Sequence, residues 1–321
     1  MAHEIETDAN GEGSAFYVGE PAWHGLGKVL PRDQDLTIPD AIVAAGLDWE
    51  VTTAPLVLKD DHEVGVPAFA TRRTTDGSIL GVVGPGYVPL QNIEAFKWFS
   101  PFLDSGLVKL EAAGSLRGGK RIWVLGKIQG QDAEVVAGDP IGGYVLLSNS
   151  HDGTMAIRSG FTRVRVVCQN TLSAAHREGT LLRIRHTSGA TLALEKVREI
   201  MDVAAHKFNL DIEVYQSLAR RNITADDLDE YVRTVFDLPS AEDQKQKVNR
   251  TLDNVVNLFE QGRGAQLKGV RGTVWGAYNA VSEYVTHERG RDQNVRVDST
   301  WFGDGQRTIE KALDIGLKLA A

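Results

Sequence analysis

A run of arginines in the middle of the chain is the feature whose chemistry is easiest to name. Six arginines occur between residues 157 and 186 with a single acid, Glu178; they are Arg158, Arg163, Arg165, Arg177, Arg183 and Arg185. Guanidinium groups on one face of a strand would bind successive phosphates. Strand alternation places Arg163 and Arg165 on one face, with valines on the other. The alternative is that these arginines pair with acids elsewhere in the fold or at a subunit interface.

A second basic segment follows a glycine. Gly114–Arg121 fits the spacing of a phosphate-binding P-loop, but Arg121 stands where a magnesium-binding hydroxyl is needed. Residues 122–125 form strands readily, whereas a P-loop opens a helix. We therefore predict a β-hairpin turn whose cations, Arg117, Lys120 and Arg121, are placed to contact phosphates.

Acid–base or nucleophilic chemistry has three candidate residues. His151 and Asp152 lie in a sequence rich in turn-forming residues, which explains them without chemistry. Cys168 follows an apolar strand, where it is either a buried, inert thiol or a thiolate activated by arginines and a helix N-terminus. Because His, Cys and Asp show no ligand spacing, we expect no metal site and no cofactor.

Three regions must position these residues. Residues 1–36 are glycine-rich and predict an irregular N-terminal arm, residues 37–190 a mixed α+β sheet domain, and residues 191–321 a helical region. Strands joined by tight turns and followed by a helix predict an antiparallel sheet with a β-β-β-α core. The predicted fold class is therefore α+β with a mostly helical C-terminal region.

Composition limits the class of protein and its expected location. The net charge of −8 excludes a basic coat over the whole surface, so a polyanion would need a local patch. The single cysteine excludes an intramolecular disulfide and favours a reducing compartment. No secretory signal or membrane-spanning stretch is evident, so we expect a cytoplasmic protein of a bacterial host with no membrane partner.

Several segments together resemble a known family. The sequences at 1–5, 17–20, 23–27, 163–172 and 275–281 are similar to phage/plasmid-like proteins of domain-of-unknown-function family 932. The resemblance implies a mobile genetic element, where such proteins accompany replication and recombination functions. At the level of fold alone, the β-β-β-α unit with a basic strand face is similar to single-strand annealing proteins, which form rings and hold DNA along a positive groove.

The leading prediction is a non-enzymatic nucleic-acid-binding protein, a homo-oligomer that holds or anneals single-stranded DNA. Arg158, Arg163 and Arg165 would contact phosphates, with further contacts from Arg117, Lys120 and Arg121. One alternative is an enzyme with a site near His151, Asp152 and Cys168. Another is an interaction or inhibitor protein whose acidic helical half, residues 191–321, binds a host partner or mimics DNA.

Overall fold

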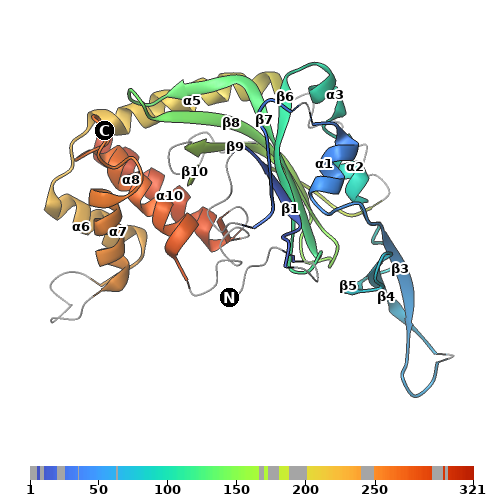
Figure 1. Ribbon diagram of the computed structural model, residues 1–321. Coiled ribbons are helices and arrows are strands. Elements are labelled where there is room, and N and C mark those ends of the chain that lie inside the picture. Colours follow the sequence, from blue (N-terminus) through green and yellow to red (C-terminus); the bar gives the residue numbers. More distant parts are fainter. Residues whose placement is uncertain are drawn as a thin grey trace.

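The structure is a computed structural model. It describes residues 6–7, 11–19, 26–34, 36–62, 64–165, 170–172, 181–187, 201–239, 249–290, 299–300 and 303–321. The fold is mixed α+β, as predicted, with a large curved sheet and a group of C-terminal helices (Figure 1). Cys168 lies outside the described residues, so its predicted environment is not addressed.

The main sheet has eight strands in the spatial order β10-β9-β8-β7-β6-β1-β2, and β11 also pairs with β9. The strands are β1 (Ala15–Val18), β2 (Lys28–Leu30), β6 (Val108–Leu116), β7 (Arg121–Glu134), β8 (Pro140–Ser150), β9 (Ile157–Arg165), β10 (Asn170–Leu172) and β11 (Leu181–Ile184). Neighbours are antiparallel except β1 and β2. The consecutive strands β6, β7, β8 and β9 form an antiparallel meander, as predicted, and β10 and β11 precede the long helix α5 in the chain.

The N-terminal segment differs from its prediction. The glycine-rich residues 1–36 were expected to be irregular, but β1 pairs with β6 and β2 extends the sheet. The side chains of Ala15 and Phe16 are completely buried. Residues 15–18 and 28–30 are therefore part of the main sheet, and Phe16 belongs to its larger apolar core.

A smaller sheet projects from the body (Figure 1). It consists of β3 (Val51–Val57), β4 (Gly65–Arg73) and β5 (Ile79–Val83), paired in that order and antiparallel. We call these three strands the projecting sheet.

Some of the described helices begin at a side chain that caps the N-terminus. The described helices are α1 (Ile38–Ala44), α2 (Asn92–Lys97), α3 (Ser100–Asp104), α5 (Met201–Arg220), α6 (Ala225–Val235), α7 (Arg250–Gln261), α8 (Val274–Glu283), the π-helix η1 (Tyr284–Glu288) and α10 (Asp304–Ala320). Thr37 and Thr224 cap α1 and α6 by accepting hydrogen bonds from the backbone N–H groups of Asp40 and Asp227. None of the described helices is both long enough and apolar enough to cross a membrane.

Strand alternation gives the main sheet two different faces. On the outer face, Val124 and Val145 belong to a core that includes Phe96 of α2 and Phe161 of β9. Further along the same face, Ile141 of β8 shares a second core with residues of α5. Figure 1 shows α1, α2, α3 and α5 on this convex side of the sheet. The opposite, concave face carries a smaller apolar cluster; its buried members are Ala15, Ala112, Leu116, Trp123, Leu125, Tyr144 and Leu146.

Candidate nucleic-acid interface

Arg163 lies on the outer face of β9 and is completely buried. Its Nε lies 3.2 Å from Oδ2 of Asp211 on α5, and its guanidinium lies 5.2 Å from the centre of the Phe208 ring. Burial lowers the pKa of Arg163, and the Asp211 carboxylate opposes that shift. The prediction that Arg163 is an exposed phosphate contact is wrong in this structure, because α5 covers this face and supplies a carboxylate. The side chain of Arg165 lies outside the described part of the chain.

Arg158 lies on the other face of the same strand. It is five residues from Arg163 in a strand that pairs with β8 without a register shift, and an odd separation puts the two side chains on opposite faces. Arg158 therefore lies on the concave face, where it is partly exposed. Arg158 and Arg163, which were both predicted to contact phosphates, therefore lie on opposite faces of β9.

A different set of arginines does share the concave face. Arg158 is directly opposite Ser148 of β8 and, on its other side, directly opposite Arg183 of β11. Arg121 of β7 is opposite Ser150, which shares a face with Ser148. We call Arg121, Arg158 and Arg183 the arginine row. Two like charges directly opposite one another destabilise a sheet, and an anion bound between them would remove that cost.

The β6–β7 turn extends this basic end of the sheet. Arg117 adopts a left-handed conformation with φ of 57° at the turn, and Lys120 is exposed. The carbonyl of Lys120 accepts a 2.8 Å hydrogen bond from the backbone N–H of His151, which ties this turn to the β8–β9 turn. Arg121 donates a hydrogen bond to Thr154 in the same β8–β9 turn. The predicted hairpin is confirmed, and the P-loop alternative fails because no helix follows.

His151 and Asp152 have separate structural partners. His151 is completely buried and its Nε2 lies 2.9 Å from Oδ1 of Asn92. Burial, together with the nearby His186, lowers the pKa of His151 to about 3. Burial raises the pKa of Asp152, but hydrogen bonds from Ser150 and Thr154 outweigh it and the net shift is downward. His151 therefore completes a core, and Asp152 shapes a turn.

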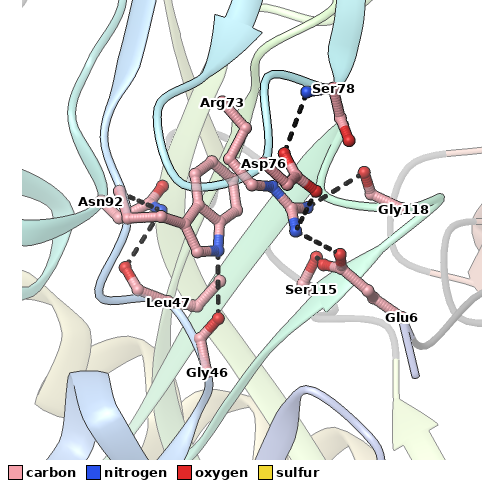
Figure 2. Close-up of polar contacts among 10 residues, drawn as sticks. Glu6, Gly46, Leu47, Arg73, Asp76, Ser78, Asn92, Ser115 and Gly118 are labelled. Atoms are coloured by element: carbon pink, nitrogen blue, oxygen red, sulfur yellow. Dashed lines mark hydrogen bonds and ion pairs between the residues drawn. The ribbon is translucent and has the colours of Figure 1, made fainter. Parts of the chain in front are cut away.

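The projecting sheet is fixed to the body at this same basic end (Figure 2). Nη1 of Arg73 lies 2.5 Å from the Glu6 carboxylate, and Nη2 donates to the carbonyl of Gly118 in the β6–β7 turn. The guanidinium also lies 4.3 Å from the centre of the Trp49 ring. Thr71 donates a 2.7 Å hydrogen bond to the carbonyl of His151. Arg73 is thus engaged in holding the projecting sheet to the body.

A second charged group lies at the far end of the concave face and was not predicted. Lys109 and Lys127 are directly opposite one another, and Lys127 forms a 3.1 Å ion pair with Asp132. Glu111 lies at a register shift of β6, where burial raises its pKa against the opposing charges of Lys127 and Arg32. Alternation alone could not locate this group, because both strands change register here.

Arg183 is the residue of the row that sequence reasoning did not assign. It belongs to the arginine run, so composition pointed to it, but its position opposite Arg158 depends on β11 folding back onto β9.

Within the described residues, no group of three or more His, Cys, Asp or Glu side chains could hold a metal ion.

Comparison with known proteins identifies a family without assigning an activity. No curated protein and no solved structure matches the chain. Residues 79–301 match the family described as domain of unknown function, DUF932, and this region covers more than half of the sequence, including every strand from β5 to β11. The chain therefore belongs to the DUF932 family.

Proposed function

We propose that this protein binds single-stranded nucleic acid through the arginine row on the concave face of its main sheet. The observation that carries the proposal is the placement of Arg158 directly opposite Arg183, with Arg121 on the same face two strands away. Exposed Lys120 and Arg185 continue the basic surface on either side. Arg117 at the β6–β7 turn is a further contact in this proposal.

The extent of the row favours a polyanion over a single small anion. The row spans β7, β8, β9 and β11, and neighbouring strands lie about 4.8 Å apart, which gives a width of about 14 Å. That width accommodates more than one phosphate. We choose a single strand as the partner because its backbone bends more readily than that of a duplex, whose persistence length is about 50 nm.

Because the rest of the protein is acidic, a nucleic acid would bind only at the basic patch. With a net charge of −8, the rest of the surface repels a polyanion, so affinity would depend on these few cations and on salt. An origin in a phage or plasmid, a place in replication or recombination, and strand annealing belong to the same proposal. They follow from the resemblance of the sequence to mobile-element proteins.

Fluorescence anisotropy with a labelled oligonucleotide at low salt tests the proposal. Replacing Arg158→Glu together with Arg183→Glu should weaken binding by at least about a hundredfold, because two contacts to phosphate become repulsive. The matched control is Arg220→Glu with Arg221→Glu, which makes the same charge change at exposed positions at the end of α5.

Equal losses in the two double variants would mean that only total charge matters, and the arginine row would then have no specific role. Unchanged binding in Arg158→Glu with Arg183→Glu would reject the interface outright. Tighter binding to a duplex than to a single strand would reject the choice of partner while leaving the basic surface in place.

A further inference from the structure

The β6–β7 turn, which presents cations of the proposed interface, has an unusual backbone. Residues 117–120 lie between the paired ends of β6 and β7. Arg117, Gly118 and Gly119 follow one another with positive φ values of 57°, 63° and 84°. This region is sparsely populated and is costly for Arg117, which carries a side chain, so the surrounding structure must hold the turn in place.

The guanidinium of Arg73, at the end of β4, reaches this turn from the projecting sheet (Figure 2). It donates a 3.2 Å hydrogen bond to the carbonyl of Gly118 and pairs with the Glu6 carboxylate. It also lies over the ring of Trp49. A planar guanidinium can stack on a ring and bond through its edge at the same time, whereas a lysine ammonium is a single point charge. The contact therefore uses a geometry that arginine provides and lysine does not.

Gly119 leaves the space in which this guanidinium lies. A Cβ at residue 119 would overlap Nη2 of Arg73 and would lie 3.3 Å from the ring of Trp49. Any side chain there would therefore displace the end of Arg73 from the turn. At the neighbouring Gly118, φ is also positive, but an added Cβ would have no atom within 4 Å. The two glycines thus share a type of backbone strain and differ in their contact with Arg73.

We propose that Arg73 is a positioning residue for the nucleic-acid interface. Inserted between Trp49 and Gly119, it fixes the β6–β7 turn so that Lys120 and Arg121 meet the phosphates. Arg73 is buried and its charge faces Glu6, so it acts through the turn and not by touching the nucleic acid. The proposal rests on the proposed function and adds to it a residue from the projecting sheet.

Hydrogen–deuterium exchange of the full chain without nucleic acid tests the positioning step by itself. The reporter is the backbone N–H of His151, which donates to the carbonyl of Lys120 in the turn. Gly119→Ala should speed its exchange by at least about tenfold, because the turn loses the support of Arg73. Gly118→Ala is the matched control and should change that exchange by no more than about twofold.

Anisotropy with a labelled oligonucleotide then tests the effect on the interface. Gly119→Ala should weaken binding by about tenfold with no change of charge, and Gly118→Ala by no more than about twofold. Arg73→Lys keeps the charge but loses the stacked, bonded geometry, so it should bind as weakly as Gly119→Ala. Neither effect should appear in a chain that already carries Lys120→Gln with Arg121→Gln, because Arg73 acts only through those two residues.

Circular dichroism checks that each variant folds, and Arg73→Lys decides the matter if Gly119→Ala does not. Equal exchange in the two alanine variants would overturn the positioning step whether or not the chain binds nucleic acid. Wild-type affinity in Arg73→Lys, or an undiminished loss from it in the chain lacking the two turn cations, would show that Arg73 does not act through the turn. A wild-type chain that binds no oligonucleotide would instead reject the proposed function, and the interface role of Arg73 with it.

Discussion

The two faces of β9 each carry an arginine, but the two arginines lie in opposite environments. On the outer face, Arg163 is covered by α5 and bonded to Asp211, so its charge is neutralised within the fold. On the concave face, Arg158 lies beside exposed Arg183, so two positive charges are placed together at the surface. The comparison shows that the role of an arginine on a strand depends on which element covers that face of the strand. Residues far away in the sequence supply that cover.

Breaking the buried ion pair should have the largest effect on stability. Asp211→Ala leaves the Arg163 guanidinium buried without its carboxylate, so we expect a loss of about 3–5 kcal/mol in the free energy of unfolding. Urea denaturation followed by circular dichroism measures this loss. Arg183→Ala, on the concave side, should change stability by no more than about 0.5 kcal/mol. Similar losses in both variants would remove the distinction between the faces.

The outer side also holds a buried histidine that should make stability pH-dependent. His151 has a pKa of about 3 in the folded chain against 6.5 as its ordinary value, so the unfolded chain takes up its proton first as the pH falls. This contribution to stability is therefore present above pH 6.5. It is lost by up to about 1.4 kcal/mol per pH unit between pH 6.5 and 3. Urea titrations at several pH values should show a shallower acid loss in His151→Gln. Identical profiles for the variant and the wild type would contradict this assignment.

The salt dependence of oligonucleotide binding sharpens the same comparison. Each phosphate contact to a single strand contributes about 0.7 to the slope of log K against log salt. Arg183→Ala should lower the magnitude of that slope by about this amount, as measured by anisotropy at several salt concentrations. Arg163→Met in a chain that still folds should leave the slope unchanged. A lower slope in the Arg163 variant would place that residue at the interface after all.

The smallest net effect is expected when both members of the buried pair are replaced. Arg163→Met with Asp211→Leu removes the two charges together, and such replacements are often neutral or mildly stabilising. The double variant should recover most of the stability lost in Asp211→Ala and should still bind the oligonucleotide. Additive losses in urea denaturation would show that the pair does not act as a unit.

Local signals in the sequence were sufficient for much of the fold. The β6–β7 hairpin and the alternation within β9 depend on neighbours close in the chain, and the structure confirms them. The coverage of each face depends on Asp211, which is far from Arg163 in the sequence. The opposition of Arg158 and Arg183 likewise depends on long-range pairing of β11. Because periodicity within one strand does not carry that information, the sequence showed the basic run but not what covers each face of β9 or which arginine lies opposite Arg158.

Photo-crosslinking of a thymidine-analogue oligonucleotide, with the labelled peptides identified by mass spectrometry, tests the concave-face interface most directly. The account predicts adducts in residues 117–121, 157–160 and 181–185, which lie at one end of the main sheet. Adducts confined to the C-terminal helices or to the tip of the projecting sheet, with those three segments unlabelled, would contradict it.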